Sequence, residues 1–94
     1  MRLVLNGNCY KLNKIVIRRE LDGYLLYLPI KDAIYFVNQS AKEIIDILQK
    51  SEDGKIEVEE ITKKIQNKYK ESDIVDIQDI KDYVENLIEL GVVG

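Results

Sequence analysis

The side chains that could do acid–base chemistry are mostly carboxylates, because the 94-residue chain contains no histidine and a single cysteine, Cys9. A histidine general base, a Ser-His-Asp triad, a Cys/His zinc site and an internal disulfide are therefore excluded. Neighbouring carboxylates such as Glu59-Glu60 and Asp79 with Asp82 fit a solvated helix surface, and the sequence has no glycine-rich phosphate loop. We expect a protein that is not an enzyme and that uses neither a metal nor a cofactor.

Composition and charge indicate one small domain with an ordered core. Hydrophobic residues make up 46% of the sequence and charged residues 33%, a balance typical of globular chains. The net charge of -3 gives no reason to expect a nucleic acid or a membrane as partner, since both favour basic surfaces. The amino-terminal apolar run is too short for a signal peptide, and no transmembrane-length run follows. We therefore expect a cytoplasmic protein.

Three apolar runs predict an antiparallel sheet. The runs are rich in β-branched and aromatic residues and are separated by turn-forming residues. They span residues 14–19, 24–28 and 33–37, with turns at residues 21–23 and 29–32. Pro29 closes the second strand.

The register of the last two strands predicts a sheet with two apolar faces. If Pro29 and Asp32 flank the turn, Tyr27 faces Ile34 and Leu25 faces Phe36 on one side. The opposite side then carries Tyr24, Leu26, Leu28, Tyr35 and Val37. Such sheets commonly leave one face polar, so helices should cover one face and a further partner should meet the other face or the edge.

Apolar residues at helical spacing predict three helices after the third strand. The first opens where Ser40 and Glu43 have the spacing of a capping box. The second covers roughly residues 58–70, and the third ends at Gly91, which is suited to follow a helix. The lysines expected on the solvated face of the second helix are Lys63, Lys64, Lys68 and Lys70. Three strands followed by three helices make an α+β, winged-helix-like fold.

Residues 1–12 precede these patterns. Two short apolar runs flank Asn6-Gly7, which suits a type I′ turn, and so predict a tight hairpin. The alternative is a loose arm, because terminal segments are often ordered only by a partner. We therefore divide the chain into residues 1–12, an arm or extra hairpin, and residues 13–94, a single domain.

The third predicted strand, residues 33–37, contains neither charge nor proline, the features that normally protect a sheet edge. If this strand lies at the edge, its unpaired N–H and C=O groups can pair with a strand added by a peptide. Self-pairing of the edge into a homodimer is the competing outcome. On the third helix, Tyr83 and Leu90 widen the apolar stripe on one flank, either to pack against the amino-terminal segment or to form one wall of a groove.

A winged-helix DNA-binding regulator is the alternative class, since three helices with a small sheet can make that fold. Its recognition helix should bring positive charge to the phosphates. The third helix instead sets Lys81 against five acidic residues, namely Asp76, Asp79, Asp82, Glu85 and Glu89. Repulsion from the duplex makes DNA binding the weaker hypothesis.

Several short motifs, in this order and spacing, resemble the PqqD-like family of recognition elements for ribosomally made, post-translationally modified peptides. They are LLYLP at residues 25–29, VNQSA at 37–41, VEEI at 58–61, Asp76 or Asp79 before an apolar helix, and LIELGVV at 87–93. Each motif is weak alone, but together they cover most of residues 13–93. The chain departs from the family at Val37, where leucine is usual, and in a longer segment at residues 51–54.

This resemblance implies a non-catalytic peptide chaperone that binds the leader of a precursor peptide. The leader would add as a strand beside residues 33–37, in a groove against the third helix. Such proteins present the precursor to a modifying enzyme, often a radical SAM enzyme and sometimes a leader peptidase or cyclase. The residues implied as the peptide-binding site are Ala33, Ile34, Tyr35, Phe36 and Val37 on the strand, and Ile80, Tyr83, Val84 and Leu87 on the helix.

Overall fold

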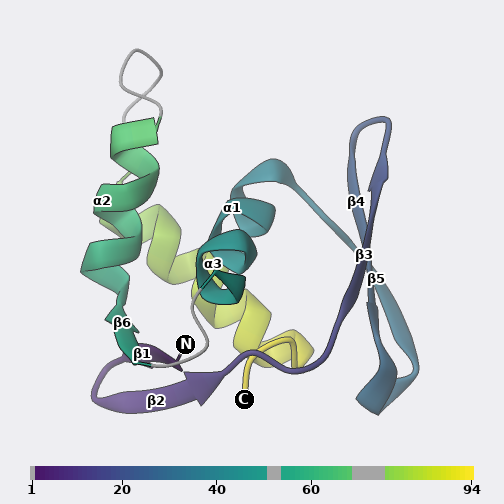
Figure 1. The fold of residues 1–94 in the computed structure, drawn as a ribbon, viewed down its shortest axis with the longest axis horizontal. Helices are drawn as coiled ribbons and strands as arrows, with labels where there is room; N and C mark the ends of the chain where they lie inside the picture. The colour runs from purple at the N-terminus through teal and green to yellow at the C-terminus, as the bar shows by residue number, and fades with distance from the viewer. Residues whose placement is uncertain (1, 51–53, 69–75) are drawn as a thin grey trace.

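The computed structural model describes residues 2–50, 54–68 and 76–94, which form two small sheets and three helices (Figure 1). In chain order the elements are β1 (Arg2–Leu5), β2 (Asn8–Lys11), β3 (Val16–Glu20), β4 (Gly23–Leu28), the 3-10 turn η1 (Pro29–Lys31), β5 (Ala33–Val37), α1 (Gln39–Gln49), β6 (Lys55–Glu57), α2 (Val58–Lys68) and α3 (Ile77–Leu90). The α+β fold, with a three-stranded antiparallel sheet and three helices, is confirmed.

The larger sheet has the order β3-β4-β5, and all its pairs are antiparallel. Leu25 lies opposite Phe36 and Tyr27 lies opposite Ile34, so the predicted register is confirmed. The chain turns between β4 and β5 through η1, and Asp32 adopts a left-handed conformation with φ of 48°, which an aspartate tolerates better than most residues.

The start of α1 differs from the prediction. Asn38, in extended conformation, is the N-cap, and its side-chain oxygen accepts a hydrogen bond from the Ala41 N–H at 3.0 Å. Ser40 therefore lies inside the first turn, and the capping box with Glu43 is wrong. The side chain of Asn38, just outside the helix, satisfies a free N–H group of the first turn. The Glu43 side chain is therefore available for other contacts.

Both ends of α3 follow ordinary capping rules. Asp76 caps α3 through a hydrogen bond from the Gln78 N–H at 3.1 Å. Gly91, with φ of 84°, ends α3 in the left-handed conformation that glycine adopts most easily. The helix α2 ends at Lys68, and the last two residues of its predicted range, 69–70, lie outside the described residues.

Residues 2–11 form the hairpin rather than the loose arm, with β1 and β2 paired antiparallel across a turn at Asn6-Gly7. The short strand β6, which the sequence patterns did not predict, pairs in parallel with β1. The carboxyl-terminal residues extend the same region, because Lys11 and Gly94 exchange backbone hydrogen bonds of 2.8 and 3.0 Å. The hairpin is thus part of the folded body.

The core lies between the two sheets and the helices. Figure 1 shows β3-β4-β5 at one side of the molecule, with α1 and α3 next to it, α2 beyond them and the β1–β2 hairpin along one end. The inner face of the larger sheet contributes Leu26, Leu28 and Val37, and β1 contributes Leu3 and Leu5. The helices add buried residues from their apolar stripes: Ala41, Ile44, Ile45, Leu48, Val58, Ile61, Ile65, Ile80, Val84 and Leu87.

Candidate functional site

Strand β5 lies at the edge of its sheet, as a peptide-binding strand must. Within the described part of the chain it is paired with β4 alone. It carries no charged residue and no proline over Ala33–Val37. The edge therefore lacks the charge and proline that block strand addition in most sheets.

The hairpin geometry indicates which backbone groups of β5 face outward. The turn at Leu21-Asp22 joins Glu20 directly to Gly23, the closing pair of a two-residue hairpin. Backbone groups alternate sides along a strand. The N–H and C=O groups of Gly23, Leu25 and Tyr27 therefore point to β3, and those of the alternate residues of β4 point to β5. We infer that Ile34 and Phe36 direct their N–H and C=O groups to the open edge.

The side chains of β5 divide between the two faces of the sheet. Ile34 and Phe36 lie on the outer face and are 66% and 58% exposed. Ala33 and Tyr35 are half-buried and Val37 is buried on the inner face. A strand added beside β5 would therefore meet two exposed apolar side chains on one face.

Helix α3 contacts the chain at both ends of β5. Before the strand, Lys31 Nζ donates to the carbonyl oxygen of Leu90 at 3.2 Å. After the strand, Asn38 Nδ2 lies 3.4 Å from the hydroxyl oxygen of Tyr83. The helix and the strand are thus connected at two points that flank the predicted binding edge.

Most of the predicted groove wall is core instead. Ile80, Val84 and Leu87 are each 1% exposed or less, because α3 packs against both α1 and α2 on that stripe. Of the four helix residues in the predicted site, Tyr83 alone keeps partial exposure, packed at the margin of the core. The other three lie in the core of the peptide-free chain, so Tyr83 is the accessible part of the predicted wall.

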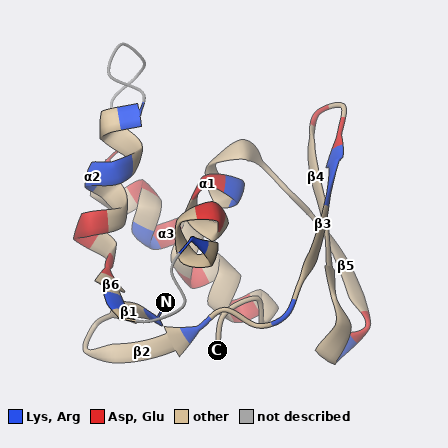
Figure 2. Ribbon diagram, in the orientation of Figure 1, with Lys and Arg blue, Asp and Glu red and all other residues tan. Residues whose placement is uncertain are grey.

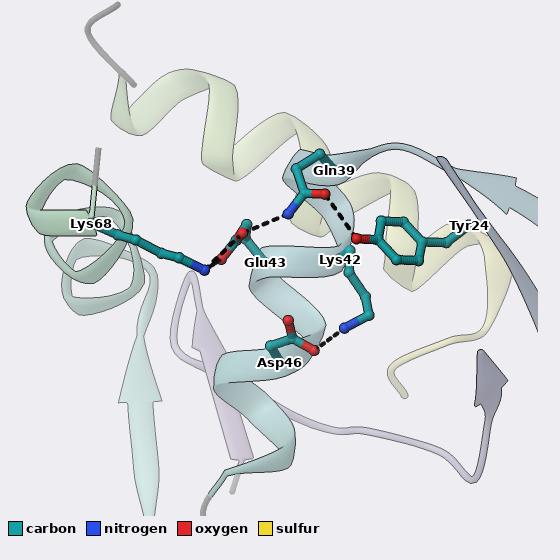
Figure 3. Close-up of polar contacts among 6 residues, drawn as sticks. All are labelled: Tyr24, Gln39, Lys42, Glu43, Asp46 and Lys68. Carbon is teal, nitrogen blue, oxygen red and sulfur yellow. Dashed lines mark hydrogen bonds and ion pairs between the residues drawn. The ribbon is translucent and has the colours of Figure 1, made fainter. Parts of the chain in front are cut away.

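A chain of polar contacts, which sequence reasoning missed, connects the sheet to α1 and α2 (Figure 3). The hydroxyl of Tyr24 donates to Gln39 Oε1 at 2.9 Å, and Gln39 Nε2 donates to Glu43 Oε1 at 2.6 Å. Glu43 is 5% exposed, and both its carboxylate oxygens accept from Lys68 Nζ, at 2.9 and 3.0 Å. The available signal was the four-residue spacing of Gln39 and Glu43 on one helix face.

A second contact of α1 reaches the sheet in the same region. Lys42 is paired with Asp46 one turn later, and its Nζ lies 5.3 Å from the centre of the Tyr24 ring, within cation–π range. Lys63, Lys64 and Lys68 are exposed as predicted, and Lys68 is in addition paired with Glu43. Lys70 lies outside the described residues.

The turn before β5 brings Asp32 into hydrogen-bonding contact with Tyr27 and shifts the pKa of that tyrosine. The Tyr27 hydroxyl donates a hydrogen bond to Asp32 Oδ1 at 2.8 Å. This hydrogen bond, with some desolvation and the negative charge of Asp32, raises the pKa of Tyr27 above its ordinary value. The contact joins the side chain of Tyr27 on β4 to Asp32, which lies just before β5.

Two surface cavities are lined by described residues of the helices. One of about 360 Å³ lies between α1 and α2 and is lined mainly by charged side chains around Ile47 and Ile65. The other, of about 640 Å³, lies between α2 and the start of α3. Among the described residues no cluster of three metal-ligating side chains is found.

The side chains considered for chemistry in the sequence are exposed at the surface. Cys9 is a free, exposed thiol on β2, and the paired carboxylates Glu59-Glu60 and Asp79 with Asp82 are exposed on helix surfaces. No helix in the described ranges is long and apolar enough to cross a membrane.

Comparison of the chain with family models, with curated proteins and with solved structures gives no match.

Proposed function

We propose that this protein is a non-catalytic peptide chaperone that binds the leader of a ribosomally made precursor peptide. The leader would add as a strand to the open edge of β5, and the complex would present the precursor to a modifying enzyme. That enzyme would be a radical SAM enzyme, or a leader peptidase or cyclase. The chain itself would need no cofactor.

The observation that carries this proposal is the unprotected edge of β5. Backbone pairing along Ala33–Val37 would supply affinity without regard to sequence, and side-chain contacts beside Ile34, Phe36 and Tyr83 would supply specificity. The resemblance of the sequence motifs to PqqD-like recognition elements supports the same strand as the binding edge. The five acidic residues on and before α3 argue against a duplex at that helix.

The proposal can be tested by selecting ligands from a phage-displayed library of random 12-residue peptides and labelling a selected peptide with fluorescein. In fluorescence anisotropy, Ile34→Pro should weaken binding at least tenfold relative to Ile34→Ala, because proline removes an outward N–H and adds a ring at the docking edge. Both variants lose the isoleucine side chain, so the difference isolates the backbone. Circular dichroism checks that both remain folded.

Equal affinity of the two Ile34 variants, with the fold intact, would refute strand addition at β5. A labelled DNA duplex serves as the second probe. Binding of the duplex at physiological salt, with no peptide selected above background, would favour the DNA-binding regulator instead.

A further inference from the structure

The outer face of the β3-β4-β5 sheet is apolar and uncovered. In the observed register its side chains form two rows across the strands, Val16–Tyr27–Ile34 and Arg18–Leu25–Phe36. Val16, Ile34 and Phe36 are 56%, 66% and 58% exposed. Contiguous exposed apolar patches of this kind commonly mark interaction surfaces.

Charge is confined to the margins of this face. Figure 2 shows the charged residues of the sheet on β3 and at the turns, while β4 and β5 carry none. The single cation in the two rows is Arg18, whose guanidinium is paired with Glu20 at 2.6 Å. That pairing partly neutralises the arginine and so lowers the cost of covering it.

The Phe36 ring lies over Gly23 on the outer face of the sheet. A Cβ at Gly23 would be 2.6 Å from Phe36 Cζ and 3.0 Å from Phe36 Cε1. One side of the ring therefore packs on the glycine backbone, as aromatic residues do beside strand glycines. The remaining exposed surface of the ring faces away from the sheet and is open to a cation or an apolar group.

We propose that this face pairs with the same face of a second copy of the chain, about a two-fold axis parallel to β4. Such an axis places β3 of each copy over β5 of the other. Arg18 then lies over Phe36 of the second copy, and Val16 lies over Ile34. Leu25 and Tyr27 on the central strand meet their own counterparts. No like charges face each other across the axis, and each row of one copy packs against the same row of the other copy.

The face is small for a protein interface, which indicates a weak dimer. Three strands about 4.8 Å apart and five residues of about 3.3 Å each give a footprint of roughly 250 Å² per copy. A standard stable interface buries about 800 Å² per partner. The dimer should therefore be weak and reversible, with a Kd on the order of 100 μM.

The pairing shares the side chains of Ile34 and Phe36 with the proposed peptide site, but it differs from strand addition in its geometry. It uses the face of the sheet, whereas strand addition uses the backbone groups at the β5 edge. It therefore differs from self-pairing of two β5 edges. A variant on β3 can disrupt the face and leave the edge intact.

Sedimentation velocity of the full chain from 10 μM to 1 mM tests the proposal. The wild-type protein should change from monomer to dimer over this range, and Val16→Lys should weaken association at least tenfold. Val16 is more than half exposed, so the folded monomer tolerates the lysine. Leu21→Lys is the matched control, because Leu21 is 98% exposed in the turn beyond the two rows and its replacement should leave association unchanged.

A double-mutant cycle with Arg18→Gln and Phe36→Leu tests the orientation. A cation–π contact across the axis predicts a coupling of about two- to fivefold in the dimer Kd. A monomer at 1 mM would overturn the proposal. So would a dimer that survives Val16→Lys but is lost in Ile34→Pro, because that pattern describes edge pairing.

Discussion

Replacing Lys68 with methionine should destabilise the protein more than replacing Glu43 with glutamine, although both changes break the same ion pair. The two partners differ in burial: the Glu43 side chain is 7% exposed and the Lys68 side chain is 59% exposed. In Glu43→Gln, the ammonium of Lys68 can turn to water. In Lys68→Met, the carboxylate of Glu43 stays in the protein interior without that cation.

The magnitudes follow from this asymmetry. Glutamine at position 43 preserves the shape of the side chain and the acceptor for Gln39 Nε2. The decrease in the free energy of unfolding should therefore be close to that for loss of an exposed ion pair, about 0.5–1 kcal/mol. Removing the cation from a fully buried carboxylate costs about 3–5 kcal/mol. Because Gln39 still donates to Glu43, we expect about 2 kcal/mol for Lys68→Met. The double variant should be more stable than Lys68→Met alone, because it carries no buried charge.

Urea unfolding followed by circular dichroism measures these differences, and thermal unfolding provides a second reading. For a domain of this size, 2 kcal/mol corresponds to a decrease in Tm of roughly 8–15 °C. Lys42→Met is the control, since it removes the cation of an i,i+4 pair and its contact with the Tyr24 ring, but the carboxylate that it leaves, Asp46, is 32% exposed. If Lys68→Met costs no more than Glu43→Gln, or if the double variant is the least stable, the reasoning from burial is refuted.

Two further predictions concern the β4 strand. Gly23→Ala should lower the free energy of unfolding by about 1–3 kcal/mol, because its Cβ would lie 2.6 Å from Phe36 Cζ and 2.8 Å from the Val37 carbonyl oxygen; urea unfolding with no loss of stability would contradict this. For Tyr27, the raised pKa means that the Asp32 contact contributes stability below about pH 10, the ordinary tyrosine pKa, and that this stability is lost as pH rises through the folded-state pKa. Asp32→Asn should lower the Tyr27 pKa in an NMR titration, and an unchanged value would show that Asp32 is not the cause.

The larger sheet could be predicted because its signals are local. Two apolar runs on either side of the turn containing Pro29 and Asp32 leave one register that alternates correctly, and that register is observed. By contrast, β6 consists of Lys55, Ile56 and Glu57. Its strand character comes from pairing with β1, about fifty residues earlier in the sequence, so no local pattern identifies it.

The candidate site was predictable only in part. Absence of charge and proline from residues 33–37 showed only that the strand would be unprotected if it lay at an edge, and the edge position itself is seen in the sheet order. The apolar stripe of α3, however, looks the same whether it lines a groove or fills a core, and Ile80, Val84 and Leu87 are core. Periodicity gives the face of a helix but not which neighbour covers it. Likewise, the spacing of Ser40 and Glu43 predicted a capping box, and no local pattern indicated that α2 would bring Lys68 against Glu43.

The carboxyl-terminal residues of the chain have a consequence for the order of folding. Val92 and Val93 are 0% and 1% exposed, and Asn13 N–H donates to the Val92 carbonyl oxygen at 2.9 Å. These contacts join residues about eighty positions apart, which raises the contact order and slows the final closure of the core. During synthesis at the ribosome, the β3-β4-β5 meander can pair early. The backbone contacts of Lys11 and Asn13 with residues 92–94 cannot form until those residues emerge from the exit tunnel, so a partner present during translation would meet the sheet before this closure.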